Sequence, residues 1–277
     1  MSPFMSAYMS DRMTSAWLAA VALVFGVSAC RPAVERVAMG NGATGVAVGT
    51  DTIGPASAGG APASAFPAPS REVADIVAPR WTAEDDRDDA GEFATVARLA
   101  GIRGGQAVAD IGAGDGYYVA RLSPLVGGTG VVYGQDIVPD YLALLQRRVD
   151  RDRLTNVKVV LGEPHDPRLP PASVDVALMI HMYHEISQPF ALLWNLASSM
   201  KPGGTLVILD LERPTYGHGT PPALLDCELT RVGYRRRSFT RTGPAEYVTI
   251  YVAPTAAERP TPVSITASLA ARPCRAS

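Results

Sequence analysis

The feature that most constrains the fold is the run Val-Ala-Asp-Ile-Gly-Ala-Gly-Asp-Gly-Tyr-Tyr at residues 108–118. It indicates the end of a buried strand, a glycine turn, and a helix that begins at about Tyr117. The glycines at Gly112, Gly114 and Gly116 lack the Cβ atoms that would hold a ligand away from the backbone. The free N–H groups of the following helix favour a carboxylate or phosphate there. The run therefore predicts a ligand site at this turn.

Apolar runs alternate with helical patterns along the chain after this turn. A first helix is expected to begin at a capping box formed by Thr82 and Asp85 and to end at Gly101. Continuous apolar strands that alternate with helices are typical of a parallel sheet covered on both faces. We therefore expect an α/β fold with a doubly wound, mostly parallel seven-stranded sheet. Strands are expected at 107–111, 131–136, 157–161, 174–180 and 205–210, with a closing hairpin at 234–240 and 247–252, and further helices at 118–125, 141–149 and 190–200.

The glycine spacing separates two classes of ligand. Dinucleotide sites use Gly-x-Gly-x-x-Gly, whereas this chain has Gly-x-Gly-x-Gly with Asp110 two residues before it. That variant resembles motif I of the class I S-adenosylmethionine-dependent methyltransferases. Residues 180–185, Ile-His-Met-Tyr-His-Glu, resemble the family's segment after strand four, and Lys-Pro-Gly-Gly at 201–204 resembles its turn before strand five. The resemblance covers about residues 107–210. It implies a Rossmann-like methyltransferase fold, S-adenosylmethionine as cofactor and a small-molecule acceptor.

Two further acidic residues follow predicted strands and are candidate cofactor contacts, together with Asp110 and the three glycines. Asp136 ends the second strand, where its two oxygens could accept both ribose hydroxyls of an adenosine. That placement also suits a nicotinamide cofactor, so it does not discriminate between the two. The resemblance implies that Glu163, after the third strand, meets the adenine amino group, although the family more often has Asp there.

Two histidines lie where the fourth strand ends, and they are the candidate catalytic residues. Histidine can act as a general base near neutral pH, so His184, and after it His181, could deprotonate an acceptor. A structural role for both remains the alternative. Asp210, at the end of the fifth strand, could contact the acceptor or the cofactor. The four histidines and three cysteines lack the spacing of a zinc site, so no metal is expected.

Composition excludes some partners. A net charge of −2 with 47% hydrophobic residues describes a globular protein and does not suggest nucleic acid as a partner. The basic cluster at Arg231, 235–237 and Arg241 is local; a solvated face is the favoured interpretation, and a patch for an anionic substrate or a membrane surface is the alternative. A disulfide between Cys227 and Cys274 is left open by the sequence.

The N-terminus suggests export. Residues 17–27 are apolar but fall short of the roughly 20 residues that span a bilayer, and they have the length of a signal-peptide core. The following Val-Ser-Ala-Cys at 27–30 resembles the lipobox of bacterial lipoproteins. This resemblance implies lipid attachment at Cys30 and a domain in the cell envelope that faces the periplasm. An uncleaved anchor, or a mis-assigned start with a cytoplasmic protein, is the alternative.

The expected organisation follows from composition. Residues rich in Ala, Gly, Pro, Ser and Thr cannot bury enough apolar surface to order themselves. We therefore expect a signal at 1–30, a flexible linker at 31–79, a methyltransferase domain at 80–254 and a disordered tail at 255–277. Two rival functions stay open: an NAD(P)-dependent oxidoreductase on a related sheet, and a non-catalytic ligand-binding lipoprotein. The second gains weight because S-adenosylmethionine is made in the cytoplasm.

Overall fold

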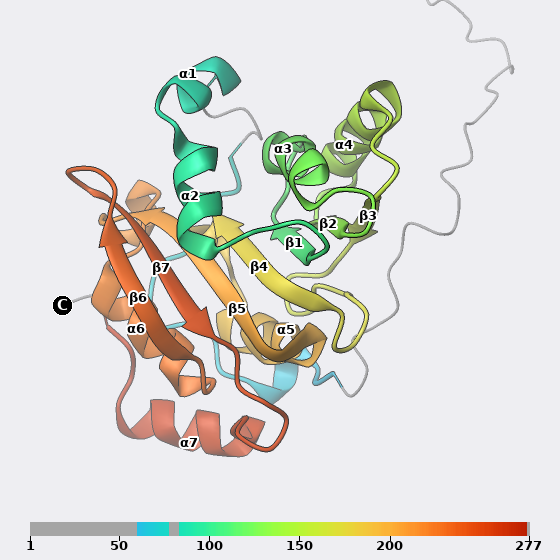
Figure 1. Ribbon diagram of the computed structural model, residues 1–277. Coiled ribbons are helices and arrows are strands. Elements are labelled where there is room, and N and C mark those ends of the chain that lie inside the picture. The colour runs from blue at the N-terminus through green and yellow to red at the C-terminus, as the bar shows by residue number, and fades with distance from the viewer. Residues whose placement is uncertain (1–59, 78–82, 276–277) are drawn as a thin grey trace, which may run out of the picture. The chain divides into compact units, whose positions relative to one another are not determined.

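The computed structural model describes residues 60–77 and 83–275, which fold around a seven-stranded sheet (Figure 1). The strand order is β3-β2-β1-β4-β5-β7-β6. The first five strands are parallel, and β7 is antiparallel to both β5 and β6. The expected fold class is therefore confirmed. The strands are β1 (Ala107–Ile111), β2 (Val131–Asp136), β3 (Val157–Leu161), β4 (Val174–Ile180), β5 (Met200–Leu211), β6 (Arg235–Arg241) and β7 (Glu246–Val252).

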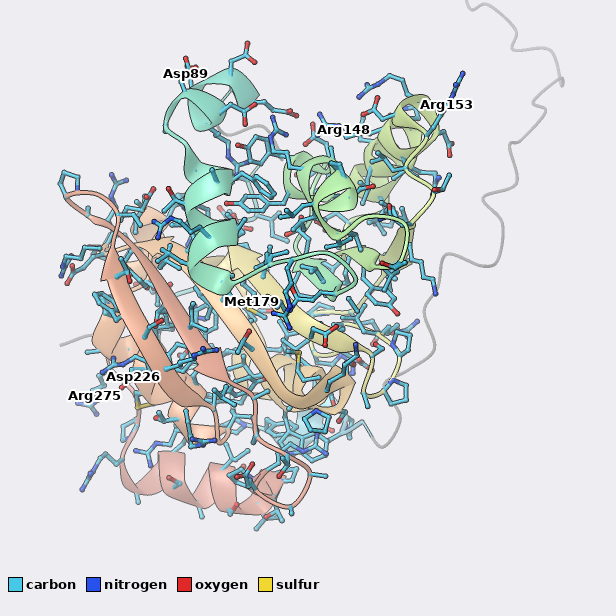
Figure 2. The ribbon with its side chains drawn as sticks, in the orientation of Figure 1. Asp89, Arg148, Arg153, Met179, Asp226 and Arg275 are labelled. Carbon is cyan, nitrogen blue, oxygen red and sulfur yellow. A yellow bond between two sulfur atoms is a disulfide. The ribbon has the colours of Figure 1, made fainter. Side chains whose placement is uncertain are left out.

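Helices cover both faces of the sheet (Figure 1). Successive side chains of a strand point to opposite faces, so the apolar strands feed two separate cores. Val176 and Leu178 of β4 pack in the core that includes α2, α3 and α4. Ala177 and Met179, on the same strand (Figure 2), belong to the core that includes α5 and α6. These helices are α2 (Glu92–Ala100), α3 (Tyr117–Val126), α4 (Pro139–Asp152), α5 (Pro189–Ser199) and α6 (Pro222–Arg231).

The first predicted helix is two helices, α1 (Glu84–Asp89) and α2. Gly91, with a φ of 65°, takes the left-handed conformation that breaks the helix between them. Thr82 lies outside the described residues, and Ala83 caps α1 without a side-chain hydrogen bond. Gly101 ends α2 as expected. The break lets α1 turn over the end of the sheet (Figure 1).

Residues 60–77, which we call the strap, correct the predicted linker at 31–79. Phe66 and Ala74 of the strap are buried. The Phe66 ring packs against Trp194 of α5, with 5.9 Å between ring centroids. The prediction failed because composition does not show that Phe66, in a stretch of small residues, has a ring on α5 to pack against. Residues 31–59 lie outside the described residues.

A buried arginine holds the strap to the domain. The Arg71 guanidinium donates to the carbonyl oxygens of Tyr183, His184 and Ile186, each at 3.2 Å. It also pairs with Glu228 of α6 at 3.1 Å. A buried guanidinium is stable only when its donors are satisfied and its charge is balanced. Arg71 therefore fixes the strap beside the segment that follows β4.

The C-terminal segment corrects the predicted disordered tail at 255–277. Pro262–Ala271 form helix α7, which Thr261 caps by accepting a hydrogen bond from Ser264 N–H. Ile265 and Leu269 bury one face of α7. Thr261 as the capping residue and Pro262 as the first helical residue are local signals of a helix. The small-residue composition of the segment led to the prediction of a disordered tail instead.

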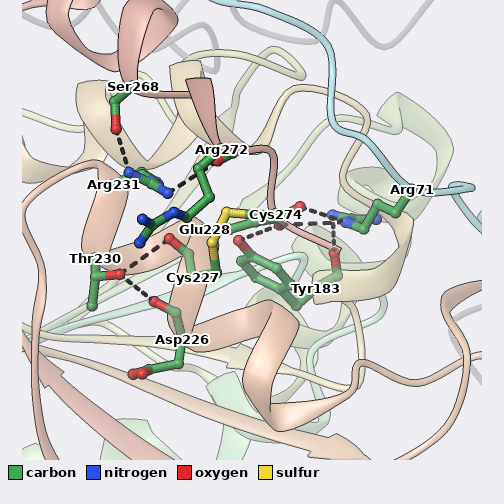
Figure 3. The surroundings of a disulfide bond; sticks show 10 residues. All are labelled: Arg71, Tyr183, Asp226, Cys227, Glu228, Thr230, Arg231, Ser268, Arg272 and Cys274. Carbon is green, nitrogen blue, oxygen red and sulfur yellow. Dashed lines mark hydrogen bonds and ion pairs between the residues drawn. A yellow bond between two sulfur atoms is a disulfide. The ribbon is translucent and has the colours of Figure 1, made fainter. Parts of the chain in front are cut away.

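A disulfide joins Cys227 of α6 to Cys274 beyond α7 (Figure 3). The two cysteines are 47 residues apart. In the chain-entropy model a loop of that length adds about 4 kcal/mol to stability. The disulfide thus secures the segment that the sequence left as a tail.

The predicted signal segment, residues 1–30, lies outside the described residues. Within the ranges 60–77 and 83–275, no helix combines the length and the apolar character needed to cross a bilayer.

Candidate functional site

A cleft opens at the carboxyl ends of β1, β2 and β4. β1 lies between β2 and β4, so the strand order reverses there, which is where open α/β sheets bind ligands. The cleft holds about 1100 Å³ of space, part of it open to solvent. The predicted site residues that line it are Asp110, Gly112, Gly114, Asp136, Glu163 and His181.

The three glycines of the turn have two different roles: two of them line the cleft, and the third permits two helices to pack closely. All three have left-handed φ angles, 73° at Gly112, 56° at Gly114 and 92° at Gly116. Gly112 and Gly114 line the cleft, whereas Gly116, predicted to contact the cofactor, is absent from its lining. A Cβ on Gly116 would lie 2.4 Å from Cδ1 of Leu145 in α4. Gly116 therefore permits close packing of α3 against α4.

Asp136 ties the glycine turn to the end of β2. Its Oδ2 accepts a hydrogen bond from Gly114 N–H, and its Oδ1 accepts one from Val138 N–H, each at 2.9 Å. Burial raises the pKa of Asp136, and the backbone hydrogen bonds oppose that rise. A carboxylate oxygen can accept more than one hydrogen bond, so both oxygens keep acceptor capacity toward the cleft.

Asp110 is the most perturbed acid of the turn. It is 3% exposed, and burial raises its pKa from 3.8 to about 7. The Arg87 guanidinium opposes this shift, and the Asp136 carboxylate adds to it. A buried carboxyl with a raised pKa is typical of a site that awaits a positive partner.

Glu163 lies at the rim of the cleft. Its side chain is 40% exposed and pairs with Arg168 and, at 3.4 Å, with His165. The isolated bridge between Glu163 and Asp166 shapes the loop after β3. The Glu163 carboxylate therefore lines the cleft as predicted, but the two side chains that it pairs with, Arg168 and His165, lie on its own loop.

The strap supplies a wall of the cleft that the sequence did not indicate. Ile76 and Val77 line the cleft. Val77 N–H donates to Oε1 of Glu185 at 3.2 Å, and Tyr141 donates to the Val77 carbonyl at 3.2 Å. Burial raises the pKa of Glu185 from 4.5 to about 7. The strap thus joins the half-buried carboxyl of Glu185 to the site.

The two candidate histidines differ in position. His181 lines the cleft, and its Nε2 lies 3.6 Å from Oε2 of Glu92 in α2. His184 is 2% exposed and is not part of the cleft lining. Its Nδ1 lies 3.1 Å from Oδ1 of the buried Asp210. The structure therefore brings His181 to the cleft and places His184 behind its wall.

Arg87 of α1 is a cleft residue that sequence reasoning missed. Its guanidinium pairs with Glu92 at 2.6 Å and lies 3.7 Å from the centroid of the Tyr117 ring. Four acids surround it in the sequence, so the segment has the composition of a solvated helix face. The turn at Gly91 is what brings this side chain inward, and no local pattern indicates that direction.

The charge of the cleft favours a cationic ligand. Its lining holds five carboxyl groups and one guanidinium, that of Arg87. Even with Asp110 and Glu185, whose pKa values are about 7, only partly ionised at neutral pH, the lining carries more negative than positive charge. Such a cleft repels a pyrophosphate and attracts a sulfonium or an ammonium group. The carboxyl groups are those of Asp110, Asp115, Asp136, Glu163 and Glu185.

Comparisons with known proteins agree with this geometry. Residues 108–204 match a family model described as a methyltransferase domain. The chain is 30% identical over 110 residues to a protein-L-isoaspartate O-methyltransferase of Methanothrix thermoacetophila, which covers 40% of this chain and 50% of that protein. It is 31% identical over 118 residues to the ubiquinone/menaquinone biosynthesis C-methyltransferase UbiE of Pseudomonas putida, which covers 42% of this chain and 46% of that protein. The matched segment thus spans about half the length of each relative.

A solved structure extends the comparison to the fold. A SAM-dependent methyltransferase from Aquifex aeolicus aligns with a TM-score of 0.57 and 26% identity, over 61% of this chain and 93% of that one. The fold, the family match and this structure identify a domain of the S-adenosylmethionine-dependent methyltransferase class. The cofactor of this class is S-adenosylmethionine.

The buried Asp110 carboxyl generates a prediction about stability and pH. Because its folded pKa of about 7 lies above the ordinary 3.8, the folded protein binds this proton more tightly than the unfolded chain does. The resulting stability is complete below about pH 4 and is lost as the pH rises through 7. At about 1.36 kcal/mol per pKa unit, Asp110→Asn should raise the free energy of unfolding at pH 8 by up to about 4 kcal/mol.

Chemical denaturation at pH 4, 6 and 8 measures this effect. Asp89→Asn is the control, because Asp89 is an exposed carboxyl at the end of α1 (Figure 2) and should leave the pH dependence unchanged. An Asp110→Asn protein less stable than the parent at pH 8 would show that pairing with Arg87 outweighs the burial of the charge.

Proposed function

We propose that the protein transfers the methyl group of S-adenosylmethionine to a small-molecule acceptor. The observation that carries this proposal is the carboxyl-lined cleft on the Gly-x-Gly-x-Gly turn, which suits a sulfonium cofactor. A nicotinamide dinucleotide would bring a pyrophosphate to the same carboxyl groups. The strap and α1 both contribute residues to the wall of the cleft, so we infer a small molecule as the methyl acceptor.

Each part of the cofactor has a partner in the cleft. The amino group of its methionine end fits Asp110, and the carboxylate of that end fits Arg87. The ribose hydroxyls fit Asp136, which ends β2. The adenine fits between Ile137 and the rim residue Glu163, both in the lining. This assignment uses two of the three buried carboxyl groups of the lining, those of Asp110 and Asp136, and its one guanidinium.

For methyl transfer, the protein has to position the reactants more than it has to supply reactive groups. The acceptor atom must be held in line with the methyl group, and water must be kept out. Ile76 and Val77 of the strap and Met182 after β4 supply apolar surface to the cleft for that purpose. An acceptor hydroxyl or acidic carbon also needs a base, and His181 is the histidine that faces it.

The cofactor assignment predicts that S-adenosylhomocysteine binds the full-length protein. Asp136→Ala should weaken that binding by about 1–3 kcal/mol, because a charged hydrogen-bonding partner is lost. Asp150→Ala, on an exposed position of α4, is the matched control and should bind as the parent does. Calorimetry with S-adenosylhomocysteine and with NAD measures which of the two ligands binds and how strongly. Binding of NAD alone would favour the oxidoreductase, and equal affinity of the parent and Asp136→Ala would end the ribose assignment.

The base assignment predicts a loss of turnover without a loss of cofactor affinity. His181→Ala should lower the transfer of labelled methyl groups into cell-envelope extract by about 10²–10⁴-fold. His184→Ala tests the histidine that the sequence favoured, and His165→Ala is the control at the rim. A loss confined to His184→Ala would move the base to His184. Full activity in both variants would make both residues structural, and binding without transfer in the parent would favour a non-catalytic protein.

We further propose that the protein is a lipoprotein of the bacterial cell envelope, anchored at Cys30. The lipobox-like residues 27–30 and the apolar run before them motivate this proposal. The Cys227–Cys274 disulfide supports it, because disulfides persist in oxidising compartments such as the periplasm and are rare in the cytosol.

Lipid labelling tests the anchor. Cys30→Ser should abolish incorporation of a labelled fatty acid and leave unprocessed precursor, because the lipid-bearing sulfur is gone. Cys274→Ser is the control: it removes a cysteine but should keep the label. Parent protein recovered from the cytoplasm with residues 1–30 intact and with both partner cysteines reduced would refute the proposal.

A further inference from the structure

Three metal-ligating side chains gather beside the cleft. His184, Glu185 and His218 each offer one ligand atom, and these atoms lie within 4.8 Å of one another. The first two come from the 3₁₀ turn η3 (Tyr183–Glu185), and His218 follows the turn η4 (Thr215–Gly217). The three residues therefore meet through the fold, since 33 positions of sequence separate Glu185 from His218.

His184 is held in the orientation of a metal ligand. Its Nδ1 lies 3.1 and 3.2 Å from the two carboxylate oxygens of Asp210. A buried carboxylate accepts, so Nδ1 carries the proton and Nε2 keeps its lone pair. Asp210 is fixed in turn by Thr220, whose hydroxyl donates to it at 2.7 Å, and by Leu211 N–H at 2.8 Å. A carboxylate behind a histidine is the usual support of a metal-bound imidazole.

His218 lacks a hydrogen-bond partner for its inner nitrogen. Its Nδ1 is buried and makes no hydrogen bond within the described part of the chain. Its ring stands edge-on to the His184 ring, with 5.5 Å between centroids. The His218 backbone has a φ of 55°, which is uncommon for a residue with a side chain. A buried nitrogen without a partner needs an explanation, and a bound ion supplies one.

We propose that His184, Glu185 and His218 bind a divalent first-row transition metal ion, of which Zn²⁺ is the type that best fits two imidazoles and one carboxylate. Bonds of about 2.0–2.1 Å place tetrahedral ligand atoms roughly 3.3 Å apart, so the ion draws the three groups inward. The metal affinity is tested apart from methyl transfer, whereas the role of the ion in acceptor binding rests on the proposed function.

The place of the site suggests what the ion does. Three protein ligands leave a fourth position, as in catalytic rather than structural zinc sites. Glu185 also lines the cleft, so the ion lies at the cleft wall. An oxygen of the methyl acceptor, such as a hydroxyl or a carboxylate, is the group that the open position would take.

Metal titration of the untagged full-length protein tests the site. After treatment with a chelator, the protein should bind one equivalent of Zn²⁺, measured by calorimetry. It should also bind one equivalent of Co²⁺, with visible absorption that reports nitrogen and oxygen ligands. His218→Ala should weaken Zn²⁺ binding by at least about 100-fold, and Asp210→Asn, which removes the support of His184, by about 10–100-fold. His165→Ala is the control, because this histidine pairs with Glu163 on another loop.

The outcomes separate this inference from the proposed function. Loss of Zn²⁺ binding in His218→Ala with S-adenosylhomocysteine affinity unchanged supports a distinct metal site, and it also shows that the variant is folded. Failure of the parent to bind Zn²⁺ or Co²⁺ in a stoichiometric amount overturns the proposal. Equal Zn²⁺ affinity in His218→Ala, His165→Ala and the parent overturns it as well.

Discussion

The hydrogen bond from Gly114 N–H to the Asp136 carboxylate is the interaction on which the cleft depends. It joins the turn after β1 to the end of β2, so the two segments that would hold the methionine end and the ribose of the cofactor are one rigid unit. The geometry requires a glycine at 114, where φ is 56°. It also requires a buried acid at 136, and burying that acid beside Asp110 destabilises both charged forms. A cationic ligand relieves this repulsion, so the charge that destabilises the free protein is the charge that selects the ligand.

Two buried arginines, Arg71 and Arg87, hold the walls of the cleft in place. Arg71 fixes the strap by binding three carbonyl oxygens after β4 and Glu228 of α6. Arg87 fixes α1 by pairing with Glu92 and lying over the Tyr117 ring. Removing one partner from such a buried pair leaves an unbalanced charge, which costs several kcal/mol. The walls of the cleft are thus held by specific charged contacts as well as by apolar packing.

The sequence predicted the sheet well and the walls of the cleft poorly. Strands β1 to β4 have the expected bounds because each is a stretch of five to seven mostly apolar residues, which is typical of a covered parallel sheet. The sequence predicted Gly114 from the glycine motif and Asp136 from its place at the end of the second strand. Phe66 and Arg71 were missed because their contacts are long-range: Arg71 and Glu228 are 157 residues apart. Arg87 was missed because the acids on both sides of it give the segment the composition of a solvated helix. Small-residue composition also hid α7, which packs through Ile265 and Leu269 and is followed by the Cys227–Cys274 link.

The strap changes the reach that the proposed anchor would allow. With lipid at Cys30, only residues 31–59 separate the membrane surface from the first described residue of the folded domain. At about 3.4 Å per residue, these 29 residues can span at most about 100 Å. The strap begins at residue 60 and lines the cleft only at Ile76 and Val77, so the strap adds to the distance between the membrane surface and the site. The segment before the strap and the strap together define a layer of limited depth. An acceptor would then have to be present within that layer next to the bilayer.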